Sequence, residues 1–165
     1  MTMTDTGQSQ QTTIEADPNV PTITIVREFE APRERVYRAW TDPELVAQWL
    51  GPKDTPTRID HWNLETGGSY RYASMRDGEE IATFYGSFHE ARTNERLVQT
   101  FTYDGVPDGV VLDIATFEDA GDGRTRVTIL SVAQSFEERD AMIASGMEVG
   151  VVEGFAMLDE LLAAE

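Results

Sequence analysis

The chain has 165 residues, 40% of them hydrophobic, which is enough for one globular domain with its own core. It contains no cysteine, which excludes disulfides, thiolate metal sites and a cysteine nucleophile. Its net charge of −17 marks an acidic protein and disfavours partners with phosphate backbones, so we expect no nucleic acid and no anionic membrane surface among its ligands.

The first segment, residues 1–21, is rich in Thr and Gln and has no aromatic or basic residue, which predicts a disordered polar leader. A single domain then spans 22–165. It opens with "TITIVREFE", whose alternation indicates a first strand. Two short helices in tandem follow, in "APRERVYRAW" and "TDPELVAQWL". The second helix has Thr41 or Asp42 as its cap, Pro43 near its start and Glu44 completing a capping box.

Alternating runs separated by turns rich in Gly, Asp and Asn then predict six more strands, near 57–63, 68–75, 80–91, 96–104, 109–118 and 124–133. Their short connections indicate an antiparallel meander. The last segment opens with a capping box, "SFEE", and predicts a single long helix from Phe136 to about Ala163. The expected fold class is therefore α+β: a helix-grip fold in which a seven-stranded antiparallel sheet wraps around a long C-terminal helix.

Three glycines stand four residues apart on that helix, at Gly146, Gly150 and Gly154. Each costs about 1 kcal/mol relative to alanine in a helix interior. A membrane helix-dimerisation motif is excluded, because Glu148 and Glu153 interrupt the stretch and its apolar length is insufficient. Two explanations stay open: the glycines let the helix approach the sheet closely, or they leave room for a ligand.

The strands carry many aromatic residues, and aromatic walls with a few polar tips are typical of small-molecule sites. An ordinary aromatic core is the alternative. For the strand near 80–91, the pattern does not decide whether Phe84, Gly86 and Phe88 face inward or Tyr85 and His89 do. The candidate ligand-binding residues are Trp49, Tyr70, Tyr72, Phe84, Phe88, Phe101, Tyr103, Met147, Gly150, Val151 and Gly154.

Motifs for catalysis are weak. His61 and His89 are the two histidines, and neither has the spacing of a metal site, so surface or strand positions are expected for both. A nucleophile elbow, a phosphate loop and a dinucleotide fingerprint are all absent from the sequence. We therefore assign no catalytic residue and expect no cofactor or metal. Any acid–base chemistry would have to come from Tyr70, Tyr72, Tyr103, His61 or Glu90.

Several segments together resemble the START-like, helix-grip (SRPBCC) superfamily over about residues 22–163: "REFEAPRERVYRAWTDPELVAQWLGP", "GGSYRY", "YGSFHEARTNERLVQTF", "DGRTRVTI" and "ASGMEVGVVEGFAMLDELL". They are most similar to bacterial homologues of the activator of the heat-shock-protein-90 ATPase, a branch that includes polyketide-cyclase-like proteins. The resemblance implies a deep cavity between sheet and helix that holds lipids, sterols, hormones or polyketides, and no shared catalytic set. Where many relatives have Gly-Trp in the last helix, this chain has Gly146 and Met147, which implies a softer wall.

Three functions remain in competition. The first is binding of an apolar or aromatic small molecule in that cavity. The second is a cyclase or dehydratase acting on a polyketide-like ligand, which would require a pocket group with a strongly shifted pKa. The third, a chaperone-associated activator, is disfavoured because the activator's other domain, which supplies much of its chaperone contact, has no counterpart here. We expect a cytoplasmic protein without membrane insertion, and a homodimer is possible.

Overall fold

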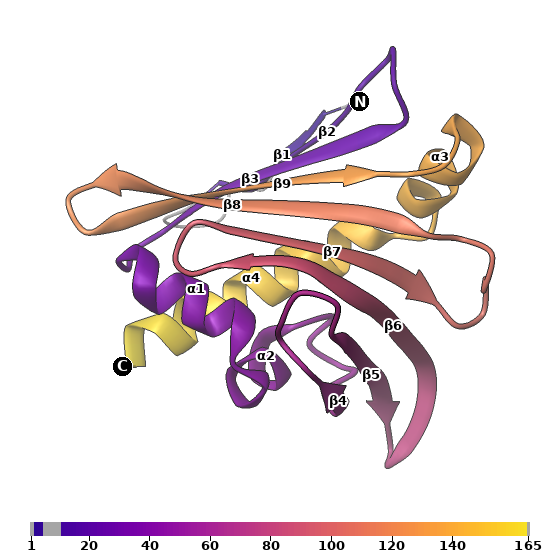
Figure 1. The fold of residues 1–165 in the computed structure, drawn as a ribbon, viewed down its shortest axis with the longest axis horizontal. Helices are drawn as coiled ribbons and strands as arrows, with labels where there is room; N and C mark the ends of the chain where they lie inside the picture. Colours follow the sequence, from indigo (N-terminus) through magenta and orange to yellow (C-terminus); the bar gives the residue numbers. More distant parts are fainter. Residues whose placement is uncertain (1, 5–10, 165) are drawn as a thin grey trace.

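The computed structural model describes residues 2–4 and 11–164. One antiparallel sheet carries helices on a single face, which we call the inner face (Figure 1). Helices α1 (Arg33–Thr41), α2 (Pro43–Trp49) and α4 (Met147–Ala164) lie on this side, and α3 (Phe136–Ala144) lies near the turn between β2 and β3. In spatial order the strands are β1 (Thr2–Thr4), β2 (Thr13–Ala16), β3 (Thr22–Phe29), β9 (Arg124–Val132), β8 (Val111–Gly121), β7 (Arg96–Tyr103), β6 (Glu79–Arg92), β5 (Ser69–Arg76) and β4 (Thr57–Trp62).

The predicted α+β helix-grip architecture is confirmed, including the first strand, both tandem helices and the six-strand meander. Asp42 caps α2 by accepting a hydrogen bond from the Glu44 N–H at 3.0 Å. The sheet nevertheless has more strands than the seven expected. The additional ones, β1 and β2, come from the N-terminal segment.

The prediction of a disordered leader is therefore wrong for the part of it that forms β2. This strand pairs with β3, placing Ile14 opposite Ile25, and Ile14 is only 2% exposed. The polar composition of the segment did not indicate this strand, because only one short run has an alternating pattern, a buried isoleucine between threonine and glutamate. Residues 5–10 of the predicted leader lie outside the described residues.

The predicted single C-terminal helix is also wrong, because it is broken between α3 and α4. Gly146 has a φ of +86°, a left-handed conformation that favours glycine and ends a helix. The two helices are bent by 60° at this point. The predicted capping box is confirmed at its N-cap, since the Glu138 N–H donates to Ser135 Oγ at 3.1 Å. In the part of the chain that the structure describes, no single helix is long and apolar enough to cross a membrane, and α3 and α4 reach that length only together, as this bent pair.

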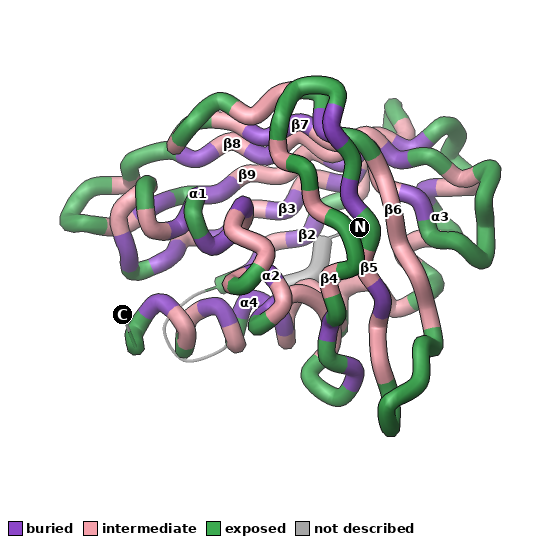
Figure 2. Tube along the Cα trace, turned by 60° about the horizontal axis from the view of Figure 1, so that its bottom comes forward, coloured by how far each residue is buried: buried purple, intermediate pink, exposed green. Residues whose placement is uncertain are grey.

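The core between the inner face and the helices is aromatic. A helix-side cluster joins Phe29, Trp40, Trp49, Phe117 and Phe155, with ring centroids 4.7 to 6.1 Å apart. A bidentate ion pair between Arg27 of β3 and Asp159 of α4, at 2.7 and 2.6 Å, attaches the helix to the sheet. The outer end of the β5–β6 hairpin extends past these helices and is exposed (Figure 2).

Strand β6 curves strongly along its length (Figure 1). Near its glycine, Gly86, two hydrogen bonds that involve side chains connect this part of the sheet to β7. The Tyr70 hydroxyl donates to the Thr100 carbonyl at 2.5 Å, and the Ser87 N–H donates to Thr100 Oγ1 at 2.9 Å. A Cβ on Gly86 would lie 2.0 Å from that carbonyl oxygen and 2.8 Å from the Tyr70 hydroxyl. Glycine is thus required for the tyrosine to cross β6 and reach β7.

Candidate functional site

Aromatic side chains from β5, β6 and β7 stack in a continuous series on the inner face. Ring centroids are 6.1 Å apart for Tyr70 and Tyr72, 5.1 Å for Tyr72 and Phe84, and 5.4 Å for Phe84 and Phe101. Phe88 joins at the Tyr70 end, 5.1 Å away. Tyr103 joins at Phe84, 5.5 Å away. We call these six residues the aromatic ladder: Tyr70, Tyr72, Phe84, Phe88, Phe101 and Tyr103.

Burial decreases along the aromatic ladder. Tyr70 and Phe88 are 2% and 1% exposed, the middle members are half-buried, and Tyr103 is 42% exposed. The ladder thus leads from the core to solvent. It also answers the open question about β6: Phe84, Gly86 and Phe88 face inward, whereas Tyr85 faces outward, beside the Arg71 guanidinium 5.8 Å away.

A row of polar side chains crosses the inner face beside the ladder. Gln99 of β7 stands opposite Asp113 of β8, which stands opposite Ser131 of β9. The Ser131 hydroxyl donates to Asp113 Oδ1 at 2.5 Å. Asp113 faces inward because Phe117, four residues further along the strand, packs against Trp40 of α1. Sequence reasoning missed this row, although the period of two in "VLDIATF" places the aspartate on the buried face.

The surroundings of Asp113 alter its protonation. Loss of hydration inside the protein raises the pKa of the carboxyl group to about 6, and the Ser131 hydrogen bond acts in the opposite direction. Asp113 and Gln99 are nevertheless half-buried, whereas Ala115 on the same face of β8 is buried. Solvent therefore reaches the polar row, and a carboxyl group that titrates near neutrality there can accept a hydrogen bond or exchange a proton.

Two tyrosines of the aromatic ladder, Tyr70 and Tyr72, are held neutral. Burial raises the pKa of Tyr70 and also that of Tyr72, so both keep their hydroxyl protons at physiological pH. Tyr70 uses its proton on the Thr100 carbonyl. Its role in the structure is therefore to hold β6 to β7.

Helix α4 faces the sheet with one stripe of side chains. Met147 and Val151, both predicted site residues, pack against the core from this helix. Glu148 has helical spacing with Val151, Phe155 and Leu158, which places it on the same stripe. Its Oε2 atom is buried and has no hydrogen-bond partner among the described residues. The α4 stripe therefore brings a second carboxylate toward the inner face.

Two of the three glycines, Gly150 and Gly154, face α2 and the loop that follows it. A Cβ on Gly154 would lie 2.9 Å from the Trp49 carbonyl oxygen, and a Cβ on Gly150 would lie 3.5 Å from Pro52 Cδ. Trp49 belongs to the helix-side cluster, with its indole N–H donating to the Ala39 carbonyl at 2.9 Å. Close packing of α4 on α2 thus explains Gly154. Ligand contact by either glycine or by Trp49 stays a prediction.

The proposed acid–base residues outside the ladder lie on the surface. His61 is exposed and bonds to Ser69 Oγ at 3.0 Å. The other histidine, His89, was not an acid–base candidate and is also exposed, on β6. Glu90 pairs with Arg92 at 2.5 Å and Arg96 at 2.7 Å. Within the described ranges, no group of three or more His, Asp or Glu residues could hold a metal ion.

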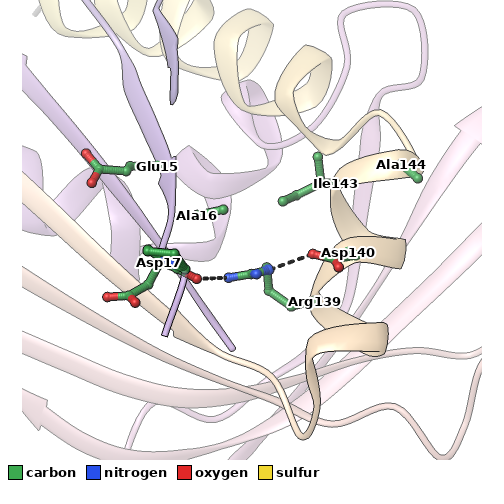
Figure 3. A pocket seen from close by; sticks show the side chains of 8 residues that line it. Glu15, Ala16, Asp17, Arg139, Asp140, Ile143 and Ala144 are labelled. Atoms are coloured by element: carbon green, nitrogen blue, oxygen red, sulfur yellow. Dashed lines mark hydrogen bonds and ion pairs between the residues drawn. The ribbon is translucent and has the colours of Figure 1, made fainter. Parts of the chain in front are cut away.

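A separate pocket of about 510 Å³ lies between β2 and α3 (Figure 3). In the strand order of the sheet, β2 is far from the strands that carry the aromatic ladder. Arg139 occupies its centre and donates to the Asp17 carbonyl at 2.8 Å and to the Asp140 carboxylate at 2.9 Å. It also donates to the carbonyls of Val20 and Thr22. Because its guanidinium is engaged with the protein itself, Arg139 is a clamp that holds the β2–β3 turn on α3. The pocket is lined by Glu15, Ala16, Asp17, Pro18, Arg139, Asp140, Ile143 and Ala144.

Comparison with known proteins gives the family. The model of the family described as "Activator of Hsp90 ATPase homolog 1-like protein" matches residues 30–163. The chain belongs to this family. No curated protein matches the chain at a significant level.

Solved structures share the fold of this activator-like chain over most of its length. A protein from Arthrobacter aurescens is 27% identical with a TM-score of 0.83, covering 92% of this chain and 91% of its own. Protein Ms6760 from Mycobacterium smegmatis is 25% identical with a TM-score of 0.82, covering 92% and 96%. A Rhodobacter sphaeroides protein is 26% identical with a TM-score of 0.82, covering 92% and 99%. The helix-grip fold expected from the resemblance is thus shared by relatives of about the same length.

Proposed function

We propose that this protein binds an apolar or aromatic small molecule on the inner face of the sheet, along the aromatic ladder. The observation that carries the proposal is the burial gradient of the ladder. Tyr72, Phe84 and Phe101 stay half-buried although they face the helices' side of the sheet, which leaves ring surface that a ligand can cover. A flat ligand would extend this stack, and each aromatic contact adds about 0.5–1.5 kcal/mol beyond the burial of area.

The family supports this proposal at the level of fold, because the chain shares a sheet whose inner face lies opposite the C-terminal helix. Met147 and Val151 would form the opposite wall from α4. The flexible thioether of a methionine adapts to ligands of different shape more readily than an indole does.

Native mass spectrometry after soaking with fatty acids, sterols and aromatic polyketides tests the proposal directly. We expect a single bound mass from the aromatic members. The matched pair of variants is Phe84→Ala and Tyr85→Ala, which lie on opposite faces of one strand. Loss of the adduct in the first variant and retention in the second would support binding on the inner face. Equal retention in both variants would place the ligand elsewhere.

A cyclase or dehydratase activity is the second candidate, and one observation favours it. Asp113 lies on the same inner face as the aromatic ladder, and its pKa is raised to about 6, toward the range that a general acid or base requires. If the protein is an enzyme, a bound polyketide-like compound should be converted at a rate that falls at least a hundredfold in Asp113→Asn. Recovery of the bound compound chemically unchanged would instead leave binding as the function.

A further inference from the structure

We propose that Asp113 selects the ligand: its carboxylate accepts a hydrogen bond from a donor group on an aromatic ring, so the site takes phenols and rejects aromatic carboxylates. This inference rests on the proposed function and narrows it to a chemical class. It goes beyond the family resemblance, which gives apolar ligands in general.

The acceptor is fixed in position. Asp113 stands in the middle of a paired row between Gln99 and Ser131, on a central strand with hydrogen-bonded neighbours on both sides. The Ser131 hydroxyl occupies Oδ1 at 2.5 Å. One serine satisfies only part of a carboxylate, which has about four acceptor positions. The remaining acceptor positions are available to a ligand because the side chain is half-buried.

Among the described residues, no cation pairs with Asp113 and cancels its charge. Arg27 of β3 is 4% exposed and is neutralised by Asp159 of α4. Tyr70 and Tyr72 of β5 remain neutral at physiological pH. Glu148 brings a carboxylate on the α4 stripe, with one buried oxygen atom that has no partner in the described part of the chain. A ligand carboxylate would place a second negative charge beside the half-buried Asp113, and like charges that are partly removed from water repel each other.

The position of the row relative to the aromatic ladder defines the ligand. Gln99 pairs with Phe88, so the polar row continues directly into the aromatic side chains of β6 and β5. A planar ring stacked on the ladder would therefore present its edge toward Asp113. A neutral aromatic compound with a hydroxyl or amine donor on that edge would fit both the aromatic ladder and the polar row.

The test measures the dissociation constants of three naphthalenes by isothermal titration calorimetry: 2-naphthol, 2-methoxynaphthalene and 2-naphthoate. They share one ring system and differ in the group offered to Asp113. In the native protein we expect the naphthol to bind at least tenfold more tightly than the methyl ether, because hydrogen bonds to charged groups have this strength. The naphthoate should bind more weakly than the ether.

The variants are Asp113→Asn and, as a control for charge, Asp54→Asn in the exposed loop after α2. The first should reduce the preference for naphthol over ether at least fivefold. Asp54→Asn should change neither the preference for naphthol over ether nor the affinity for the ether. Ser131→Ala keeps the carboxylate and frees its Oδ1, so the preference for naphthol should persist or increase in this variant.

The outcomes separate this inference from the proposed function. Equal binding of naphthol and ether to the native protein would overturn the role of Asp113 and leave aromatic binding intact. Tightest binding of the naphthoate would overturn the role of charge and leave the ladder in place. Failure of all three compounds to bind would overturn both.

Discussion

Replacing Asp113 with asparagine should stabilise the protein at neutral pH. A rise in the pKa of this carboxyl group from 3.8 to about 6 corresponds to about 3 kcal/mol in free energy of unfolding. Because the raised pKa means that folding favours the protonated form, the ionised form reduces the stability of the native state, fully so above pH 6. Asparagine can still accept the Ser131 hydrogen bond and carries no charge, so we expect a gain of about 1–3 kcal/mol at pH 7.

The sign of the pH dependence makes the prediction specific. The contribution of Asp113 to the free energy of unfolding should fall as the pH rises from about 4 to about 6, and Asp113→Asn should remove this contribution. Guanidinium chloride denaturation at pH 4.5 and pH 7, followed by tryptophan fluorescence, gives both values. The native protein and the variant should differ far more at pH 7 than at pH 4.5.

A control is needed because the chain has a net charge of −17, and removing any negative charge relieves some repulsion. Asp54→Asn removes the same charge at an exposed position and should change the free energy of unfolding by less than about 0.5 kcal/mol. If Asp113→Asn destabilised the protein at pH 7, or matched the control, the interpretation of Asp113 as a residue retained for function at the expense of stability would be refuted.

The remaining predictions concern packing, and each is checked by the same denaturation assay. Gly150→Ala should stabilise by up to about 1 kcal/mol, because its Cβ would meet a proline ring at 3.5 Å and alanine favours the helix. Gly154→Ala should destabilise by about 1–3 kcal/mol, because its Cβ would lie 2.9 Å from a carbonyl oxygen of α2; a gain here would contradict close packing. Tyr70→Phe should cost about 1–3 kcal/mol by depriving a β7 carbonyl of its hydroxyl donor, and an unchanged midpoint would mean that the bond contributes nothing. Asp159→Asn should cost about 2 kcal/mol or more, since it leaves the buried charge of Arg27 without its partner; a smaller effect in 1 M salt would indicate a screened surface pair instead.

Most of the fold could be predicted because local signals agree with one another along the chain. Strand alternation and turn residues located β3 to β9, and caps located α2 and the start of α3. The helix break was missed because the glycine spacing was read only as a feature of one helix, although Ser145 followed by Gly146 is also a common way to end one. Strand β2 was missed because its hydrophobic contribution is essentially one residue, Ile14, whose burial depends on the neighbouring strand.

The candidate site was predictable in part. The aromatic residues of β5 to β7 lie together on one face, as large side chains with a period of two indicate, and their contact with a ligand stays a prediction. Asp113 was not selected, because its raised pKa and its contact with Ser131 depend on strand pairing between segments distant in sequence. The period of two places Asp113 on the buried face of its strand, but the partner of its carboxylate is known only once the strands are paired.

The contacts of Arg139 show that the folding unit begins earlier in the chain than the residues matched by the family model. The family match begins at residue 30, after β3 has ended. A chain shortened to that boundary would lose the strand that carries Arg27, and with it the carbonyl acceptors of the Arg139 guanidinium at residues 17, 20 and 22. It would also expose one edge of β9 to pairing with other chains, a common cause of aggregation. A shortened form of the protein for crystallisation or ligand screening should therefore begin no later than Gln11.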